Sequence, residues 1–300
     1  MSTVQQQLKL EQTAQGWDRS AEGYLAFMEK TGFTRLYAQD ILDETLPVSS
    51  QNNTPKDVKI LDIAAGTGAM SIIAAQRVKA LGVGGSVLAT DFSPLMVECI
   101  EKEIKSHNLD NIKAQVMDGQ NLTLADSSID FAYIIFGIMF FPDQQRGLSE
   151  LLRVLKPGGV TGIATWSPKN PMAEWVINTL KKLVPQPTTP TPATPTTPPT
   201  PTGITLSLSD PVSIETVLKS SGFVDIKVEG KEHCFESTVD MYVDCNLDNP
   251  VLVGIKNSLP QDKQPLFADT LRQVAKELHP NGIIKINSLA YLTTARKPQL

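Results

Sequence analysis

The sequence contains few of the residues that build metal centres and disulfide frameworks. Among its 300 residues there are three cysteines and three histidines. Cys99, Cys234 and Cys245 are widely spaced and form no Cys-x-x-Cys pair, so they predict reduced thiols rather than a disulfide scaffold. The histidines are equally scattered, and we therefore expect no metal site.

A long hydrophobic run is also missing. The longest apolar stretch, FAYIIFGIMFF at residues 131–141, is about half the length needed to cross a bilayer. The opening residues, MSTVQQQLKLEQTAQ, lack the apolar core of a secretory signal. Together with the reduced thiols, these features predict a soluble cytoplasmic protein without a membrane span.

An excess of positive charge is absent as well. The chain has 27 Lys and Arg against 32 Asp and Glu, which gives a net charge of −5. Surfaces that bind nucleic acid broadly are usually basic, so we expect no nucleic-acid partner. A hydrophobic content of 41% with 20% charged residues is typical of a globular protein with an ample core.

Short apolar runs alternate with amphipathic stretches over residues 58–165. Strands are predicted at VKILDI, SVLATD, NIKAQVM, IDFAYIIF and VTGIAT, and AMSIIAAQRVKAL and QQRGLSELLRVL have helical spacing. SPLMVECIEKEIKSH begins with a capping Ser93 followed by Pro94. This alternation predicts an α/β fold, with a Rossmann-like, doubly wound and mostly parallel sheet and helices on both faces.

Other segments flank this pattern. Residues 8–46 are rich in helix formers, and PMAEWVINTLKKLV, DPVSIETVLKSSGF and LFADTLRQVAKELHPNG read as further helices. VDIKVE and LAYLTTARK read as strands. Residues 185–202 contain eight prolines and eight threonines among eighteen residues, a composition that predicts an extended surface loop. Docking of a proline-binding partner there is the alternative interpretation.

A glycine-rich turn in LDIAAGTGAMS follows the first predicted strand. Dinucleotide sites use three glycines, G-x-G-x-x-G, whereas here Gly66 and Gly68 are followed by Ser71 in the third position. Asp62, just before the turn, would repel a pyrophosphate but suits a cofactor bearing an ammonium group. Asp91 and Asp118 follow the next two strands, so the three acids lie along the carboxyl edge of one sheet. Taken alone, each of these glycines and aspartates would also be explained by an ordinary tight turn or by the start of a helix.

Five ordered motifs carry a family resemblance. DIAAGTG, ATDFSP, MDGQNL, SSIDFAYIIFGIMFFPD and LLRVLKPGG together resemble a class I S-adenosylmethionine-dependent methyltransferase, most closely the ubiquinone/menaquinone small-molecule group. The resemblance is strong over residues 58–165 and looser from residue 207. It implies seven strands with an antiparallel C-terminal strand, S-adenosyl-L-methionine as cofactor, and direct displacement of the methyl group onto an oxygen, carbon or nitrogen nucleophile.

The resemblance also assigns roles. Asp62 would orient the methionine amino group, Asp91 would bind the ribose hydroxyls, and Asp118 would recognise the adenine edge. Ala64 stands where the family often has a further glycine. The complete implied cofactor set is Asp62, Ala64, Gly66, Thr67, Gly68, Asp91, Phe92, Met96, Asp118, Gly119 and Phe136.

The acceptor site is predicted from aromatic and apolar side chains near the cofactor. An aromatic lining suits a small apolar or aromatic acceptor. Tyr24 is the residue of greatest interest, because its hydroxyl would serve both as a lid and as a donor to the methionine carboxylate. The full set of substrate residues is Trp17, Tyr24, Phe140, Phe141, Trp166, Met172 and Trp175. For any one of these side chains taken alone, a place in the hydrophobic core is the favoured interpretation.

The catalytic side chain is not identified by the sequence. His107 and His279 end helices and His233 lies in a strand-like stretch, so we expect structural or exposed histidines rather than a general base. A regulatory protein that keeps the fold but has lost turnover is the main alternative function. A nicotinamide-dependent oxidoreductase and an RNA methyltransferase fit the glycine pattern and the charge less well.

The sequence predicts four segments along the chain. Residues 1–57 are expected to form an N-terminal helical segment over the site, and residues 58–168 the cofactor-binding core. Residues 169–206 would hold a cap helix with the Pro/Thr-rich loop, and residues 207–300 the C-terminal part of the same α/β domain. The number of subunits is left open.

Overall fold

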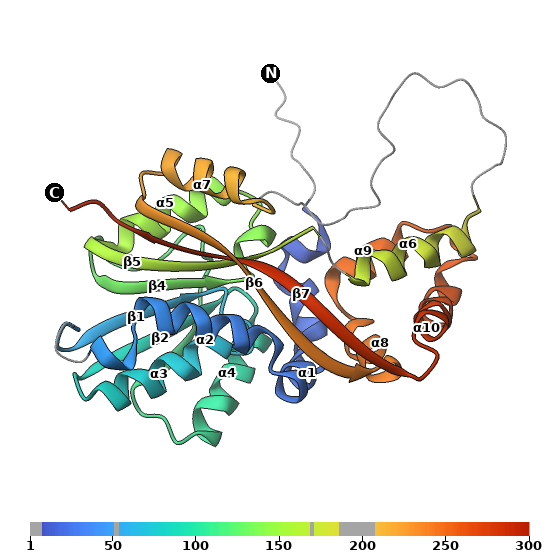
Figure 1. Cartoon of the computed structure of the whole chain (residues 1–300), viewed down its shortest axis with the longest axis horizontal. Coiled ribbons are helices and arrows are strands. Elements are labelled where there is room, and N and C mark those ends of the chain that lie inside the picture. The colour runs from blue at the N-terminus through green and yellow to red at the C-terminus, as the bar shows by residue number, and fades with distance from the viewer. Residues whose placement is uncertain (1–7, 51–53, 169–170, 186–207, 300) are drawn as a thin grey trace.

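The computed structural model describes residues 8–50, 54–168, 171–185 and 208–299. Its centre is a seven-stranded sheet in the order β3-β2-β1-β4-β5-β7-β6 (Figure 1). All neighbouring strands from β3 to β5 are parallel, and β7 runs antiparallel to both β5 and β6. The strands are β1 (Val58–Ile63), β2 (Gly85–Asp91), β3 (Ile112–Val116), β4 (Ile129–Ile135), β5 (Leu155–Trp166), β6 (Val224–Thr238) and β7 (Ile283–Arg296). The predicted fold class is confirmed.

The central strands are apolar because helices cover both faces of the sheet. In β1 every residue except Lys59 is buried, as expected for a strand packed on both sides. One face is covered by α2 (Phe33–Thr45), α3 (Ala69–Leu81) and α4 (Pro94–Ser106), and the other by α5 (Gln144–Val154) and α7 (Pro211–Ser220). The predicted cap of α4 is confirmed, since Ser93 accepts a hydrogen bond from the Met96 amide.

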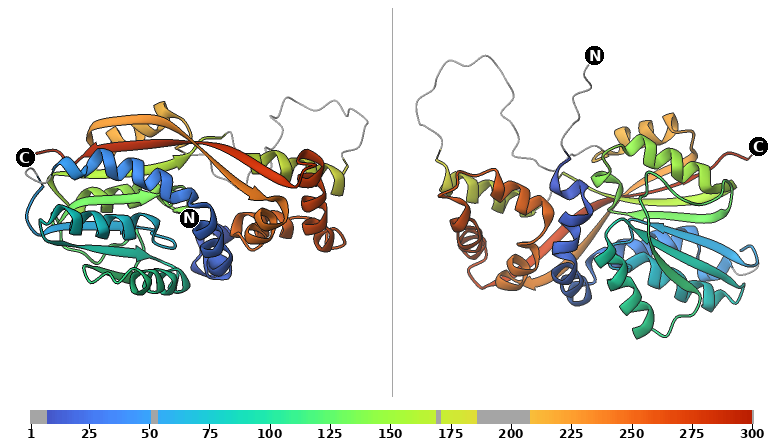
Figure 2. Two further views of the ribbon diagram at one scale, coloured as in Figure 1. Left: turned by 60° about the horizontal axis from the view of Figure 1, so that its bottom comes forward. Right: turned by 180° about the vertical axis from the view of Figure 1, so that it is seen from behind.

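A second layer of helices stands beyond one end of the sheet, and we call it the cap. It consists of α6 (Pro171–Leu183), α8 (Val239–Asn246), α9 (Pro250–Asn257) and α10 (Phe267–Leu278) (Figures 1 and 2). A hydrophobic cluster of its own joins these helices to residues of β6 and β7. The segment 283–288 of β7 pairs with β6 alone, so a two-stranded ribbon connects the sheet to the cap.

This ribbon differs from the prediction. VDIKVE predicted a six-residue strand, whereas β6 has fifteen residues, and β7 begins six residues before the predicted strand. Most of β6 is exposed or half-buried, so it lacks the apolar periodicity on which the prediction depended. Within residues 207–300, helices α8, α9 and α10 pack in the cap cluster, whereas α7 packs against the sheet. The Pro/Thr-rich stretch lies, except for Pro185, outside the described residues.

The N-terminal helix α1 (Ala14–Thr31) connects the two regions. It contacts α4 on the side of the sheet and α8 and α9 in the cap. The approach to α8 is close, because a side chain at Gly23 would lie 3.2 Å from the carbonyl oxygen of Cys245. Helix α1 therefore forms one wall of the space between the sheet and the cap.

Candidate active site

A cavity of about 280 Å³ lies where the carboxyl ends of the parallel strands meet α1 and the cap. Its walls come from the strand ends of β1, β2, β4 and β5, from α1, and from α6, α8 and α9. This is the edge at which ligands bind in doubly wound sheets. The cavity therefore lies where the sequence predicts a cofactor.

Asp62, at the end of β1, is the most deeply buried acid of the cavity, with 1% of its surface exposed. One carboxylate oxygen accepts a 2.5 Å hydrogen bond from the Ser71 hydroxyl, and the other, Oδ1, has no partner among the described residues. Burial raises the pKa of Asp62 to about 7. The unpartnered oxygen is therefore available to accept a hydrogen bond from a ligand.

Asp91, at the end of β2, fixes the glycine-rich turn. Its Oδ2 accepts a hydrogen bond of 2.9 Å from the Gly66 amide, and its Oδ1 accepts one of 3.0 Å from the Ser93 amide. Burial raises the pKa of Asp91 to about 6, although these bonds favour the ionised form. The carboxylate lines the cavity and is held in one orientation by backbone donors from both sides.

The turn after β1 adopts backbone angles that favour glycine. Gly66 has φ +56° and Gly68 has φ +90°. Ala64 has φ +53°, and Phe136, at the end of β4, has φ +59°. Non-glycine residues adopt this region at a cost of about 1–2 kcal/mol, and such strain is concentrated at functional sites. Both strained residues line the cavity.

The third acid, Asp118, differs from the other two because it is exposed. Its Oδ1 accepts a 2.9 Å hydrogen bond from the Gln120 amide. The neighbouring Gly119 is required by packing, since a Cβ there would lie 2.5 Å from the Phe141 ring. Of the predicted cofactor residues, all line the cavity except Gly68, which lies against Ile100.

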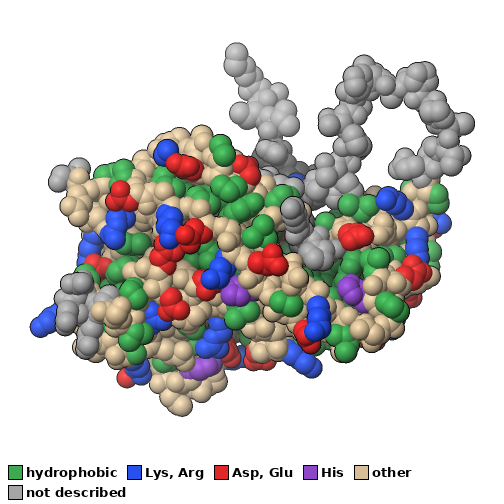
Figure 3. Space-filling model, in the orientation of Figure 1, with side chains coloured by type: hydrophobic (Ala, Val, Ile, Leu, Met, Phe, Trp, Pro, Cys, Tyr) green, Lys and Arg blue, Asp and Glu red, His purple; other side chains and the backbone are tan. Residues whose placement is uncertain are grey.

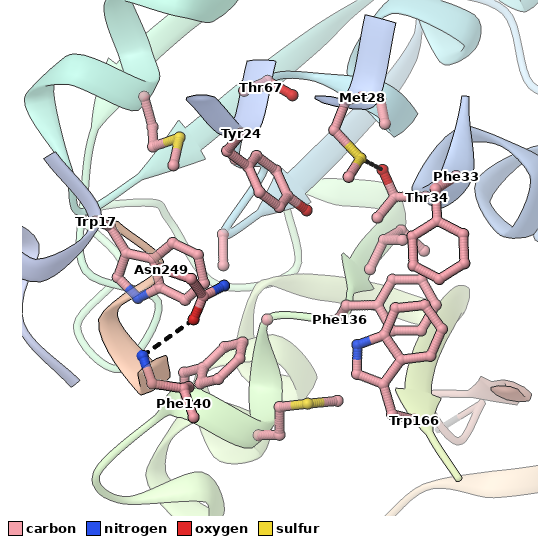
Figure 4. A pocket seen from close by; sticks show the side chains of 18 of the residues that line it. Trp17, Tyr24, Met28, Phe33, Thr34, Thr67, Phe136, Phe140, Trp166 and Asn249 are labelled. Atoms are coloured by element: carbon pink, nitrogen blue, oxygen red, sulfur yellow. Dashed lines mark hydrogen bonds between the residues drawn. The ribbon is translucent and has the colours of Figure 1, made fainter. Parts of the chain in front are cut away.

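Aromatic rings form much of the remaining wall (Figure 4). Trp17 makes an edge contact with Phe140 at 5.0 Å between ring centroids. Trp166 is stacked between Phe136 at 3.6 Å and Phe33 at 4.9 Å. Both of its faces are therefore covered, and only its edge is available to a ligand. Figure 4 shows the indole nitrogen of Trp166 turned toward the cavity.

Trp175 does not reach the cavity, unlike the other predicted substrate residues. It is 2% exposed and packs against Tyr242 and His279, each at 5.4 Å between ring centroids. A pattern of apolar residues on α6 does not distinguish the side that faces a cavity from the side that faces the cap interior. Trp175 is part of the cap core.

The histidines lie outside the cavity. His233 is paired with Asp40 at 2.6 Å, and His107 Nδ1 lies 2.9 Å from the Glu103 carbonyl oxygen at the end of α4. Within the described ranges, no group of three or more His, Cys, Asp or Glu could hold a metal ion. Of the helices searched in these ranges, none has the length and apolarity of a membrane span.

Comparison with known proteins agrees with this geometry. A family described as "Methyltransferase domain" matches residues 60–159. A demethylmenaquinone methyltransferase of Lactobacillus johnsonii is 36% identical over 168 residues, which are 55% of this chain and 68% of that protein. One of Geobacillus stearothermophilus is 36% identical over 38% of this chain and 47% of that protein, so the chain spans about half of this second relative.

The chain belongs to the class I S-adenosylmethionine-dependent methyltransferases. Solved structures with the same fold include phosphoethanolamine N-methyltransferase 2 of Haemonchus contortus. That protein is 17% identical with a TM-score of 0.50, over 87% of this chain and 52% of that one. The cyclase SpnF is 16% identical with a TM-score of 0.50, over 89% and 81%.

The cavity fits S-adenosylmethionine by its own chemistry. The unpartnered Asp62 Oδ1 suits the ammonium group of the methionine portion. Gly66 leaves its backbone accessible, because within the described chain the only side chain within 4 Å of the position of a Cβ there is that of Tyr24, at 3.7 Å. The acids lining the cavity therefore match a cofactor that carries positive charge.

Several cavity residues were missed by the sequence analysis. They come from α1, α2, α8, α9 and β7, and most lie in segments for which no function was predicted. A usable signal existed for α9, because Asn249 followed by Pro250 is a typical helix start. Helix α8 is only eight residues long and has no comparable signal beyond Thr238 as a cap. The missed residues include Phe27, Phe33, Tyr242, Asn246, Asn249, Leu252, Ile255 and Ser288.

Proposed function

We propose that this methyltransferase transfers the methyl group to a small, neutral acceptor with an apolar or aromatic body. The observation that carries this proposal is the charge of the cavity. Its charged lining residues are Asp62, Asp91 and Asp118, all at the strand ends, and no Lys, Arg or His lines it among the described residues. A phosphorylated or carboxylated acceptor would have no cationic partner there.

The acids and the glycine-rich turn would hold the cofactor in the roles that the resemblance implies. Bound S-adenosylmethionine supplies an activated methyl group on its sulfonium sulfur. Asp62 would bind its ammonium group, Asp91 its ribose hydroxyls, and Asp118 with Gly119 its adenine edge. The flanking contacts to adenine would come from Phe92 and Met96. In this proposal residues 58–168 form the cofactor-binding unit and residues 1–57 cover it.

The remaining wall would orient the acceptor. Direct displacement requires alignment of the nucleophile with the methyl carbon, and orientation alone supplies about 7–11 kcal/mol in favourable cases. Burial raises the pKa of Tyr24 to about 12, with a further contribution from the Asp91 charge, so its hydroxyl stays protonated and acts as a donor. The Trp166 edge offers a second donor from the opposite side of the cavity (Figure 4).

Quinone-type acceptors are consistent with this lining. Two relatives are named demethylmenaquinone methyltransferases, and a reduced quinone head group is neutral, aromatic and oxygenated. The three cysteines are free thiols, which supports a cytoplasmic location. On the face shown in Figure 3, Lys and Arg side chains are interspersed with Asp and Glu, which supports a small-molecule partner rather than a nucleic acid.

The test is calorimetric titration with S-adenosylhomocysteine, followed by methyl transfer from labelled S-adenosylmethionine to neutral phenols and quinols and to their phosphorylated analogues. Asp91→Ala should abolish micromolar binding. Asp130→Asn is the matched control, because Asp130 is a buried carboxylate of β4 that pairs with Lys156, 2.7 Å away, outside the cavity.

Three outcomes separate the possibilities. Transfer to neutral acceptors alone supports the proposal, and preferred transfer to phosphorylated ones contradicts it. Tight binding of S-adenosylhomocysteine without transfer to any acceptor would favour the regulatory alternative. The cyclase SpnF, which has the same fold, illustrates that this architecture alone does not fix an activity.

A further inference from the structure

Tyr242 is a buried tyrosine of the cap whose hydroxyl has no hydrogen-bond partner among the described residues. It is 8% exposed and lines the cavity. Its ring is held by edge contacts with Phe27 and Trp175, each at 5.4 Å between centroids, and it stacks on Phe235. Burial raises the pKa of Tyr242 well above its usual range, so the hydroxyl is a neutral donor.

The other two deeply buried tyrosines are satisfied. The Tyr37 hydroxyl donates a 2.5 Å hydrogen bond to the Ser288 carbonyl, and the Tyr133 hydroxyl lies 2.8 Å from the Thr45 hydroxyl. The Tyr242 hydroxyl makes no such bond within the described ranges, and Tyr242 is the one of the three that lines the cavity. Its hydroxyl is therefore available to donate to a ligand in the cavity that accepts a hydrogen bond.

Asn246 completes a polar pair on the same helix. It lies four residues after Tyr242, hence on the same face of α8, and it also lines the cavity. Its Nδ2 donates a 2.8 Å hydrogen bond to the Tyr242 carbonyl, which leaves Oδ1 without a partner in the described part of the chain. The pair offers one donor and one acceptor, the combination that a hydroxyl group satisfies fully.

We propose that Tyr242, supported by Asn246, binds a neutral hydroxyl group on the acceptor and so selects acceptors that carry a second hydroxyl besides the methylated atom. This inference rests on the proposed function. The pair belongs to the cap, whereas Asp62 and Asp91 belong to the sheet. The bound hydroxyl would therefore lie at the end of the acceptor remote from the cofactor acids, and Tyr242 would determine specificity without taking part in the displacement.

The experiment compares 2,7-dihydroxynaphthalene with 2-naphthol, which share a ring system and differ by one hydroxyl. Binding of each to enzyme saturated with S-adenosylhomocysteine is followed by tryptophan fluorescence, and KM and kcat are measured with S-adenosylmethionine. Tyr242→Phe should raise the Kd and KM for the diol about tenfold relative to the wild type. The kcat, and the Kd and KM for 2-naphthol, should stay within twofold of the wild-type values. Asn246→Ala should change the diol constants in the same direction.

Tyr291→Phe is the matched control, because Tyr291 is a half-buried tyrosine of β7 outside the cavity. Equal weakening of both probes in Tyr242→Phe would show a packing role and overturn the inference, as would no change. Wild-type enzyme that binds the diol no more tightly than 2-naphthol would also overturn it. Failure of the proposed function is distinct, because it would appear as absent methyl transfer in the wild type while the two binding constants could still be compared.

Discussion

The sheet and the cap contribute to one cavity by different means. At the sheet edge, positions are fixed by backbone: Asp91 is held by two amides, and the turn depends on Gly66 and its neighbours at positive φ. On the cap side, short helices present side chains such as Tyr242. Backbone geometry is preserved when side chains change, so this difference explains how a constant cofactor is combined with a variable acceptor.

The strongest test of this division is removal of the charge of Asp62. Asp62→Asn keeps the size of the side chain but removes the negative charge that we propose binds the ammonium group. We expect S-adenosylhomocysteine binding to weaken by about 30- to 4,000-fold, since losing one partner of a buried charge pair costs about 2–5 kcal/mol. Calorimetry measures the Kd, and an unchanged value would refute the assigned role.

Asp62→Asn should weaken ligand binding without lowering the stability of the ligand-free enzyme. The folded enzyme without ligand carries a penalty for the ionised Asp62, because burial raises its pKa to about 7. Asp62→Asn should therefore leave the free energy of unfolding at pH 8 unchanged or higher. Urea denaturation with and without S-adenosylhomocysteine separates the two effects.

A pH series gives the next largest effect. Binding requires ionised Asp62, whose pKa of about 7 lies above its unfolded value, so a proton must be displaced at acidic pH. The Kd should rise about 100-fold from pH 8 to pH 5 from this group alone. The free energy of unfolding of the ligand-free enzyme should change in the other direction. It should fall as the pH rises from about 4 through 7, because the buried Asp62 loses its proton over this range. Asp62→Asn should flatten the binding profile below pH 7, and a profile like that of the wild type would contradict the assignment.

Damage to the cap should separate stability from cofactor affinity. Trp175→Ala removes a buried ring from the cap core and should lower the free energy of unfolding by about 3–5 kcal/mol. The Kd for S-adenosylhomocysteine should stay within twofold where the variant is folded, because Trp175 does not line the cavity. Denaturant unfolding and calorimetry give the two values, and a large rise in Kd would mean that the cap shapes the cofactor site.

The smallest expected effect concerns backbone strain at the sheet edge. Ala64→Gly should raise the free energy of unfolding by about 0.5–1 kcal/mol, because relief of the positive φ outweighs the added chain entropy. The adjacent Ala65→Gly is the control, because Ala65 is not among the residues at positive φ. This variant should lower the free energy of unfolding by about 0.5–1 kcal/mol. Equal losses in both variants would show that Ala64 is not strained.

The sequence predicted the sheet region well for identifiable reasons. The strand VKILDI corresponds residue for residue to β1, because a strand buried on both faces is a short apolar run. Ser93 with Pro94 marked the start of α4. The acids at three strand ends could be placed on one edge because parallel strands share their direction. These signals are local and do not depend on distant parts of the chain.

The cap was predicted poorly because its signals are not local. Strand β6 is stabilised by pairing along its whole length with β7, although its own residues are mostly exposed or half-buried. Helices α8 and α9 have eight residues each and are held by the cap cluster rather than by intrinsic propensity. Trp175 and Trp166 looked equivalent in sequence, yet one lies in the cap core and the other in the cavity wall.

The sequence by itself determined the doubly wound sheet, the glycine-rich turn and the acids that a cofactor with positive charge requires. Alternating apolar segments and strand-end positions encode these features over short spans of chain. Only the tertiary structure decided which side chains face the acceptor, because α1, α8 and β7 are far apart in sequence and meet through long-range packing. It also placed Tyr242 in the cavity wall, packed against Phe27 of α1 and Trp175 of α6, a position that depends on contacts between distant segments of the chain.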